Sequence, residues 1–426
     1  MPLKIIVVGA GIAGLSAAIG LARHGHEVEV YERRTETLSE ENTAGIQPQP
    51  NCIPILKEWQ MLEDIEKVAN DARKINLRSY DEGLVATFDF KHRGRLFWAP
   101  RGMFKDTLAQ VAGRHGVQIH YGSGMAHLDV NTPAITLQDG TSVGADLIVA
   151  ADGSGSRIRQ TLYPQSRVEV HTMAVFQVAV PLDKVEKDPL LRQLLKGYET
   201  NVMVSPGRSI FMCPAPQQNQ LDMQFTDHEY SFDEDPHPEQ RLERIYDLTW
   251  LRKRYADFPA AVKAALDTAE SAFKWRLTSV SDVPQWSSDN GKIVIIGDAV
   301  HSSTPFAGQG SGMGIESGAV LAEILKDSSS GDDLSSLLKA FERIRPPRCE
   351  TMQKLALFMG DSWALKDRKA IEQRNKMWKQ MGEDPAAITR ARPDPKAPFG
   401  SVEFTKWSND YDVASVVREE LYRAKL

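Results

Sequence analysis

The sequence predicts an α/β fold in which a parallel-sheet domain is interrupted by a mainly antiparallel one and is followed by helices. Residues 3–32 have the pattern of strand, glycine turn, helix and strand, from "LKIIVVG" to "HEVEVYE". From about residue 166 to 280 the pattern changes to successive strands such as "EVHTMAVFQVAVPL". A buried strand, a glycine turn and a helix then return at "KIVIIGDAVHSSTPFAGQGSGMG".

These changes suggest where the domains begin and end. At roughly 100–200 residues per domain, 426 residues with 42% hydrophobic residues predict two to three domains. We expect 1–165 to form the first part of a dinucleotide-binding domain, 166–280 to form a substrate domain and 281–345 to complete the first domain. Residues 346–426 should be helical.

Shorter patterns refine this division. "LAQVAGRHGVQIHYGSG" predicts a helix and a strand, and "AITLQDGTSVGADLIVAADG" predicts a hairpin with an Asp-Gly turn before a buried strand. "PEQRLERIYDLTWLRKRYADF", inside the predicted substrate domain, predicts one amphipathic helix.

Composition excludes several classes of partner. The net charge is −6, and both signs are scattered, so we expect no nucleic-acid partner and favour a small-molecule substrate. Three widely separated cysteines argue against a disulfide framework and favour a reducing compartment, so we expect a cytoplasmic protein. The histidines show no metal-ligand spacing with acids or cysteines, and we expect no metal.

The apolar stretch from Ile5 to Ala22 is 18 residues long and uncharged, and it could be mistaken for a membrane helix. Three glycines, Gly9, Gly11 and Gly14, divide it into a short strand and a helix. We therefore expect no membrane segment.

The same three glycines fit the pattern G-x-G-x-x-G. The first permits a tight turn, the second lets the backbone approach a pyrophosphate, and the third lets helix and strand pack closely. Glu32 ends the second strand, where its carboxylate can accept hydrogen bonds from a ribose diol. The unit predicts a bound dinucleotide but leaves NAD and FAD open, and a turn that serves only packing is the alternative.

The second glycine-rich turn favours FAD. Asp298 follows a buried strand, where its carboxylate can bind hydroxyls such as those of a ribityl chain. The following "GQGSGMG" places backbone amides at a helix N-terminus, whose partial positive charge favours an anion such as reduced flavin. A single FAD is long enough to need both turns.

Three motifs in this order resemble the class A, single-component flavoprotein monooxygenases, the salicylate-hydroxylase-like and p-hydroxybenzoate-hydroxylase-like family. They are "GAGIAG" with Glu32, "ADGSGSRIR" with Asp152, Gly153, Ser156 and Arg159, and "GDAVHSSTPFAGQG". Weaker similarities are "GIQPQPN", "PRGMFKDTL" with Arg101, and "NDYDV". The resemblance covers essentially the whole chain and is strong over 1–165 and 290–345.

The resemblance implies a Rossmann-like FAD-binding domain of the glutathione-reductase type. NAD(P)H would reduce FAD, O₂ would form a flavin C4a-hydroperoxide, and the oxygen would hydroxylate or epoxidise a small aromatic or conjugated substrate. We expect either a monomer or a homodimer, and the sequence does not decide between them. The predicted cofactor-binding residues are Gly9, Gly11, Ala13, Gly14, Glu32, Arg33, Gln47, Arg101, Asp152, Gly153, Arg159, Asp298, Pro305, Gly308, Gln309, Gly310, Ser311 and Gly312.

The sequence departs from the family where a base is expected. Salicylate-hydroxylase-like members have P-G-x-H-F-x-x-Y-P, but "PGRSIFMCP" has Ser209 in the histidine's place and Cys213 in the tyrosine's, and Gln177 replaces a common arginine. Neither Ser209 nor Cys213 is a good base near neutral pH. We therefore expect an already activated substrate.

Three residues are the candidate catalytic groups. Pro305 would lie beside the flavin ring, Arg208 would stabilise a substrate anion, and His228 is a second candidate. His301 belongs to the flavin motif, which favours a structural role.

Other functions stay open at this point. An FAD-dependent dehydrogenase, reductase or oxidase would use the same fold, and a non-catalytic flavin-binding protein is a further alternative. The sequence does not identify the substrate or distinguish NADH from NADPH.

Overall fold

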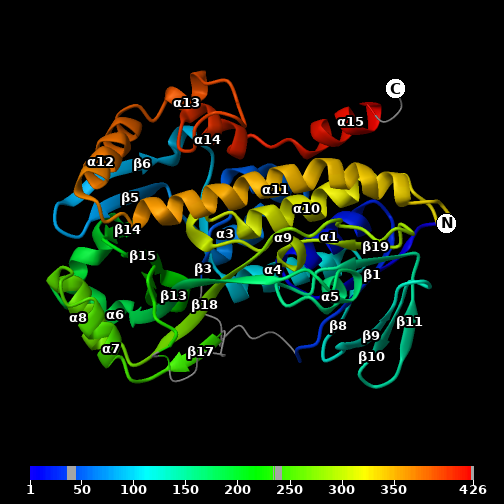
Figure 1. Ribbon diagram of the computed structural model, residues 1–426, viewed down its shortest axis with the longest axis horizontal. Helices are drawn as coiled ribbons and strands as arrows, with labels where there is room; N and C mark the ends of the chain where they lie inside the picture. Colours follow the sequence, from blue (N-terminus) through cyan, green and yellow to red (C-terminus); the bar gives the residue numbers. More distant parts are fainter. Residues whose placement is uncertain (36–44, 234, 236–241, 424–426) are drawn as a thin grey trace.

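The computed structural model describes residues 1–35, 45–233, 235 and 242–423, and it contains two large sheets joined by long helices (Figure 1). The first sheet has five parallel strands in the order β19-β12-β1-β2-β8. They are β1 (Lys4–Val8), β2 (Glu27–Tyr31), β8 (Gln118–His120), β12 (Leu147–Ala150) and β19 (Ile293–Ile295). The strands β1, β12 and β19 are almost wholly buried, as expected for a parallel sheet covered on both faces.

The helices of this part are α1 (Ile12–Arg23), α4 (Arg101–Arg114), α5 (Arg157–Leu162), α9 (Asp298–His301) and α10 (Gly310–Leu325). α1 packs against both α4 and α10. A small antiparallel sheet contains β9 (Met125–Asp129), β10 (Ala134–Leu137) and β11 (Ser142–Gly144), and β10 with β11 forms the predicted hairpin. Since β19 joins β12 after an interval of more than 140 residues, the parallel sheet is discontinuous in sequence.

The second sheet has eight strands in the order β17-β18-β13-β16-β15-β14-β5-β6. Its pairs are antiparallel except β14 with β5. The strands are β5 (Lys74–Ser79), β6 (Gly83–Asp89), β13 (Val168–Pro181), β14 (Thr200–Ser205), β15 (Arg208–Ala215), β16 (Gln220–Asp227), β17 (Leu242–Ile245) and β18 (Ala272–Val280).

The two faces of this sheet have different neighbours because successive side chains point to opposite faces. The outer face carries Ile210 and Phe225 and packs against α6 (Leu182–Lys187), α7 (Thr249–Arg254) and α8 (Ala260–Thr268). The inner face carries Val175 and Val202 and packs with Phe306, which precedes α10. The inner face therefore looks toward the second glycine-rich turn.

The sheets divide the chain differently from the predicted boundaries. β5 and β6 belong to the predicted first segment, 1–165, yet they extend the second sheet through the parallel pairing of β14 with β5. The single helix predicted over 238–258 is also wrong. Residues 238–241 lie outside the described ranges, and the rest forms β17 and the short helix α7. Pairing of Leu242–Ile245 with β18 outweighs the local helical pattern.

The C-terminal region is helical, with α11 (Ser335–Trp363), α12 (Arg368–Glu383), α13 (Ala387–Arg390), α14 (Val402–Asn409) and α15 (Val413–Arg423). The predicted boundary at 345/346 falls inside α11, which runs continuously along the molecule past α10 (Figure 1). α12 packs on β6. The predicted fold class, an interrupted α/β domain with an inserted antiparallel sheet and C-terminal helices, is confirmed.

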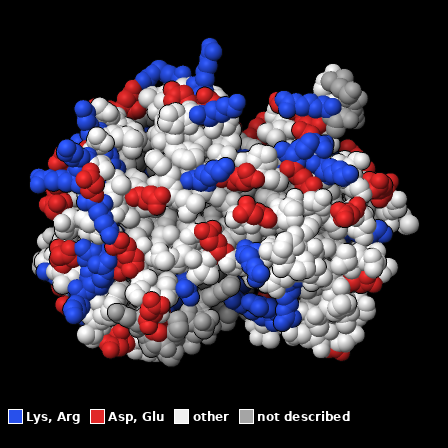
Figure 2. All heavy atoms as spheres, in the orientation of Figure 1, with Lys and Arg blue, Asp and Glu red and all other residues white. Residues whose placement is uncertain are grey.

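The remaining short elements connect the two sheets. They are α2 (Ile53–Glu58), α3 (Leu62–Val68), β3 (Gly45–Ile46), β4 (Asn70–Asp71) and β7 (Phe97–Pro100). Within the described residues, no helix has both the length and the apolar character required to cross a bilayer. Acidic and basic side chains are interspersed over the face drawn in Figure 2.

Candidate active site

The N-termini of α1 and α10 meet at one edge of the parallel sheet. A Cβ atom at Gly314 would lie 3.2 Å from the Ala13 Cβ, and one at Gly318 would lie 2.6 Å from the Ala17 nitrogen. The contacts advance in the same direction along both helices, so the helices are parallel and their N-termini lie together. Unpaired N–H groups and the helix dipoles make this edge suitable for an anionic ligand.

The first glycine turn is closed on one side and open on the other. Gly9 has a φ of +105°, and a Cβ atom there would lie 2.5 Å from the Ala151 carbonyl oxygen. A Cβ atom at Gly14 would lie 2.0 Å from the Gly9 oxygen. Gly11 has no described atom within 4 Å of its Cβ position. The turn therefore packs tightly against the end of β12 while leaving room for a ligand at Gly11.

Glu32 lies directly beside this turn. The Ala10 N–H donates to Glu32 Oε2 at 2.8 Å, and the Arg34 N–H donates to Oε1 at 2.9 Å. These bonds orient the carboxylate beside the open side of the turn, and Arg33 follows as an exposed residue. Ala13 lies in the first turn of α1, facing Gly297 and Gly314.

Asp298 and Arg101 come together from distant parts of the chain. Asp298 opens α9 directly after β19, and its side chain is exposed. Dense protein around it raises the pKa of its carboxyl, and the charge of Arg101, at the start of α4, acts in the opposite direction. The pair therefore places a carboxyl group and a guanidinium cation at the carboxyl edge of the parallel sheet.

Asp152 and Arg159 differ in how they face this edge. Asp152 Oδ2 accepts from the Arg157 N–H at 2.8 Å, while Oδ1 is buried without a described partner. Gly153, next to it, has a φ of +82° and open space around its Cβ position. Arg159 is fully buried and donates to the carbonyl oxygens of Ala299 and Ser154 at 2.6 and 2.8 Å. Arg159 thus holds the turn beside Asp298 and is a positioning residue.

The second glycine-rich turn lies against the segment after β3. Gly308 has a φ of +62°, and a Cβ atom there would lie 2.8 Å from Gln49 Nε2 and 3.5 Å from Gln47 Oε1. Gln47 Nε2 is buried without a described acceptor. Gly310 and Ser311 begin α10, and Gly310 has no described atom within 4 Å of its Cβ position.

Gln309 and Gly312 face inward, toward Asn51. The side chains of Gln309 and Asn51 bond each other at 3.2 Å. A Cβ atom at Gly312 would lie 2.8 Å from Gln309 Oε1 and 3.2 Å from Asn51 Nδ2. The absence of a side chain at Gly312 leaves the space that these two amides share.

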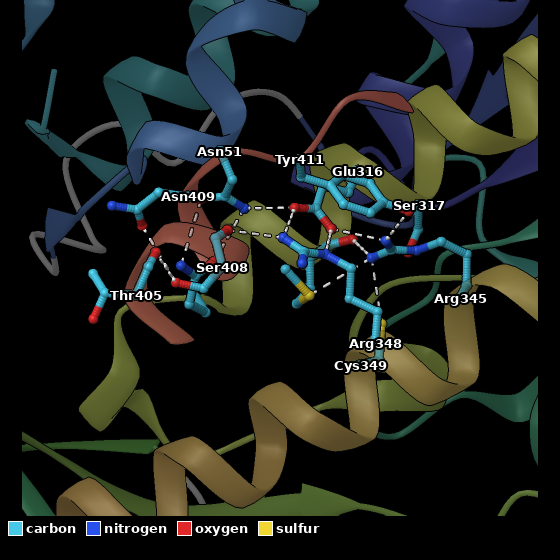
Figure 3. A network of polar contacts seen from close by, with 12 residues as sticks. Asn51, Glu316, Ser317, Arg345, Arg348, Cys349, Thr405, Ser408, Asn409 and Tyr411 are labelled. Atoms are coloured by element: carbon cyan, nitrogen blue, oxygen red, sulfur yellow. Dashed lines mark hydrogen bonds and ion pairs between the residues drawn. The ribbon is translucent and has the colours of Figure 1, made fainter. Parts of the chain in front are cut away.

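A buried network then anchors α10 (Figure 3). Glu316 accepts from Asn51 Nδ2, from Arg345 Nη1 and from Arg348 Nε, each at 2.7 Å. Burial alone would raise the pKa of Glu316, but the charges of Arg348 and Arg345 together lower it. Arg348 also donates to the Ser408 carbonyl oxygen at 2.9 Å. The network thus joins the flavin-motif helix to α11 and α14.

His301 packs inside the protein. Its Nε2 lies 3.1 Å from Ser317 Oγ, and its ring stacks on Trp286 with centroids 5.3 Å apart. Burial lowers the pKa of His301 to about 3, so the ring is neutral. This position favours a structural role.

His228, directly after β16, adds a histidine to the inner face of the eight-stranded sheet, beside Ser209. Its Nε2 is 3.0 Å from Ser209 Oγ, and its ring stacks on Phe306 with centroids 5.0 Å apart at 21°. Phe306 follows the exposed Pro305. Burial lowers the pKa of His228 to about 4, while Asp227 and Glu229 act in the opposite direction. A neutral imidazole therefore lies between the second glycine-rich turn and Ser209.

Arg208 points to the other face of the sheet, and this contradicts its predicted role toward a substrate anion. Its two terminal nitrogens bind both carboxylate oxygens of Asp257, at 2.6 and 2.7 Å. The guanidinium lies 5.2 Å from the ring centre of Phe258, against the outer helices. Strand alternation places Arg208 opposite to Ser209, so one side chain reaches the inner face and the other cannot.

Asp222 is an inner-face residue that the sequence analysis missed. Its carboxylate accepts from Gln177 Nε2 at 2.7 Å and from Gln224 Nε2 at 3.1 Å. The Gly45 backbone also bonds it, next to the segment that contains Gln47. Burial raises the pKa of Asp222 to about 7. The replacement of a common arginine by Gln177 was the one sequence feature that pointed to this part of the inner face. Cys213 is buried beside Thr200, and burial raises the pKa of its thiol.

A discontinuous parallel sheet with two adjacent glycine-rich helix N-termini, joined to an antiparallel sheet, defines a dinucleotide-binding flavoprotein. Residues 3–356 match the family described as the FAD binding domain, and the chain belongs to this family. FAD is its cofactor.

Named relatives agree with this assignment. The chain is 25% identical over 386 residues to FAD-dependent monooxygenase OpS4 of Beauveria bassiana, covering 88% of each chain. It is also 25% identical over 385 residues to hispidin-3-hydroxylase of Neonothopanus nambi, covering 82% of this chain and 86% of the relative. The protein is an FAD-dependent monooxygenase.

Solved structures share the fold. A complex of CtdE with FAD and a substrate has a TM-score of 0.81 at 18% identity, covering 99% of this chain and 98% of that one. A substrate complex of salicylate hydroxylase has a TM-score of 0.77 at 19% identity, covering 98% of both. The predicted resemblance to the class A monooxygenases is confirmed.

Proposed function

We propose that the protein uses NAD(P)H and O₂ to hydroxylate, or to epoxidise, a small aromatic or conjugated compound. The observation that carries this proposal is the contact between the neutral His228 ring and the ring of Phe306. Phe306 follows Pro305, so this contact lies where the eight-stranded sheet meets the second glycine-rich turn. Val175, Val202 and the half-buried Phe211 surround this position with apolar surface. Such surface suits a flat, weakly polar substrate.

The residues present fit FAD. A side chain at Gly9 or Gly14 would collide with backbone, whereas the space at Gly11 and Gly310 is open. We propose that the first turn, with Ala13, Asp152 and Gly153 nearby, binds the ADP end, that Glu32 binds its ribose, and that Arg33 lies alongside. Asp298 and Arg101 would bind the central part of the cofactor.

The ring end would meet the second turn. Gln47 has a buried, unpartnered Nε2, which could donate to a flavin carbonyl. Pro305, Gly308, Gly310 and Ser311 would face the ring, while Gln309 and Gly312 would shape the turn from behind. When bound, FAD reduced by NAD(P)H supplies the activated oxygen. The protein's own groups bind it, exclude water and orient the substrate.

His228 is the proposed proton acceptor. The ring is neutral above about pH 4, so the lone pair of Nε2 is free to relay the proton of a substrate hydroxyl through the Ser209 hydroxyl, 3.0 Å away. A pKa of about 4 makes the imidazole a weak base, so this relay favours a substrate hydroxyl that is itself acidic. Ionisation of a hydroxyl makes an aromatic ring richer in electrons, which favours oxygen transfer. The family's histidine position would thus be served by a side chain from the end of β16.

We further propose a cytoplasmic location and a monomeric or homodimeric state. Three free cysteines, all buried, support a reducing compartment.

The test is a substrate screen with the FAD-loaded protein under labelled dioxygen. We expect a phenolic or conjugated compound to stimulate NAD(P)H oxidation and to gain one labelled oxygen atom. A product that carries no label, formed while all the dioxygen consumed becomes hydrogen peroxide, would indicate oxidase chemistry and overturn the proposal.

A further inference from the structure

A cavity lies between the segment that follows β3 and the C-terminal helices α14 and α15. It measures about 570 Å³ and is bounded by the segment Pro50–Glu58, the loop His92–Gly94 and the segment Lys406–Ala414. None of the predicted cofactor-binding residues lines it. It is therefore separate from the proposed active site.

Most of the cavity wall is apolar. Pro50, Pro54 and Ile55 form one side, and Ile388 and Val413 contribute to the other. This surface suits the hydrocarbon body of a small ligand.

The charged side chains in the cavity wall differ in whether they have a partner within the protein. Lys406 pairs with Asp410 at 2.6 Å, and Asp412 accepts from the Ser415 N–H at 3.0 Å. Glu58 lies 3.9 Å from Arg23. Glu58 and Asp410 therefore each have a charged partner within the protein, and Asp412 has a backbone donor.

Arg93 is the exception. Its Nε is buried without a hydrogen-bond partner among the described residues, and its guanidinium lies 5.4 Å from the ring centre of Phe88. Only desolvation shifts the pKa of Arg93, downward, and no carboxylate of the described chain opposes it. A half-buried cation without a counter-charge is destabilising, and an anion bound beside it would remove this cost.

We propose that this cavity binds a small amphipathic anion, with the carboxylate or phosphate group on Arg93 and an apolar body against the proline and isoleucine wall. Bidentate hydrogen bonds from a guanidinium fit both kinds of oxyanion. The proposal does not depend on the oxygen chemistry of the active site.

The test measures binding to the FAD-loaded protein by ligand-observed NMR with hexanoate, hexyl phosphate and, as the neutral control, hexan-1-ol. We expect saturable binding of one or both anions and at least about tenfold weaker binding of the alcohol. The stronger of the two anions identifies the headgroup. FAD should stay bound, because none of the predicted cofactor-binding residues lines the cavity.

Two variants and a control locate the site. Arg93→Gln should weaken anion binding by about tenfold or more, and Ala414→Trp, which fills the cavity from its rim, should abolish it while leaving Arg93 in place. Arg95→Gln, at a neighbouring arginine already paired with Asp71 at 3.4 Å, should bind as the wild type does. Absence of anion binding to the wild type, equal binding of hexan-1-ol, or unchanged binding in both Arg93→Gln and Ala414→Trp would overturn the proposal.

Discussion

At the scale of single residues, the proposed proton transfer depends on His228. Replacing it as His228→Gln keeps a hydrogen bond to Ser209 but removes the base, so we expect oxygen transfer to fall by about 10²-fold or more. Raising the pH should restore part of the rate, because the substrate hydroxyl then ionises unaided. In the wild type the pKa of about 4 predicts a rate that stays level from about pH 5 upward with respect to this group.

The measurement is hydroxylated product per NAD(P)H in single turnover. His127→Gln, at an exposed histidine of β9, is the matched control and should behave as the wild type does. An unchanged product yield in His228→Gln would mean that His228 takes no part in proton transfer and would favour a substrate that is already activated.

Asp222 gives a prediction about stability. Its native pKa of about 7, against an ordinary value of 3.8, means that the folded protein holds this proton more tightly than the unfolded chain. The free energy of unfolding should therefore decrease as the pH rises from about 4 to about 7, by up to on the order of 4 kcal/mol. Asp222→Asn should lose this dependence, whereas Asp289→Asn, at an exposed acid, should retain it.

Urea unfolding at pH 5 and at pH 8 checks this prediction. The free energy of unfolding of the wild type, relative to that of Asp222→Asn, should be lower at pH 8 than at pH 5. A constant difference would mean that Asp222 has an ordinary pKa in the folded protein.

Glu32 and Asp298 should bind two different parts of one FAD, the ribose of its ADP end and its central part. Each charge-assisted hydrogen bond is worth about 1.5–3 kcal/mol, so Glu32→Ala and Asp298→Ala should each weaken FAD binding roughly ten- to a hundredfold. Glu27→Ala, at an exposed acid at the start of β2, is the control. FAD titration of the apoprotein gives the dissociation constants. Unchanged dissociation constants in both variants would mean that the two turns do not bind the same FAD.

At the scale of elements, the sequence predicted what local pattern determines. The strand, glycine turn and helix at 3–32 have apolar periodicity and turn chemistry that agree, and the structure has β1, α1 and β2 there. Pairing between distant segments left weaker signals. β17 is an edge strand only because β18 lies beside it, and β5 joins β14 across more than 120 residues. The partner of Ser209 was hidden for the same reason, since His228 comes from the end of the adjacent strand.

The packing of α1 on α10 yields a prediction for this scale. A Cβ atom at Gly318 would lie 2.6 Å from the Ala17 backbone nitrogen, so Gly318→Ala must push the helices apart. We expect a loss of about 1–3 kcal/mol in the free energy of unfolding, together with weaker FAD retention, because the two N-termini separate. Gly113→Ala, in α4 with open space at its Cβ position, should instead stabilise the protein by about 0.5–1 kcal/mol.

Thermal or urea unfolding, with the FAD content of the purified variants, distinguishes the two. Equal stability of Gly318→Ala and Gly113→Ala would show that the helices have room to adjust. In that case the close approach of α1 and α10 would not require a glycine at position 318.

At the scale of the whole molecule, Glu316 joins three distant parts of the chain. Asn51 follows β3, Arg345 and Arg348 lie on α11, and Arg348 reaches α14 through Ser408. A buried ion pair of this kind contributes little over apolar packing, but removal of one partner leaves uncompensated charge. Glu316→Gln leaves two buried guanidinium groups without a counter-charge, and we expect a loss of about 3–5 kcal/mol.

The pH dependence of this loss follows from the lowered pKa of Glu316. The folded protein holds the carboxylate charged more readily than the unfolded chain does, so its contribution is present above the ordinary value of 4.5 and declines as the pH falls below it. The difference in urea midpoint between the wild type and Glu316→Gln should therefore be full at pH 7 and smaller at pH 4. Glu323→Gln, on the same helix and paired only at the surface with His24 and Lys326, should change stability by less than about 0.5 kcal/mol at either pH. If Glu316→Gln also behaves in this way, α10 is held in place by its packing on α1 alone, and the C-terminal helices are not required to position the flavin motif.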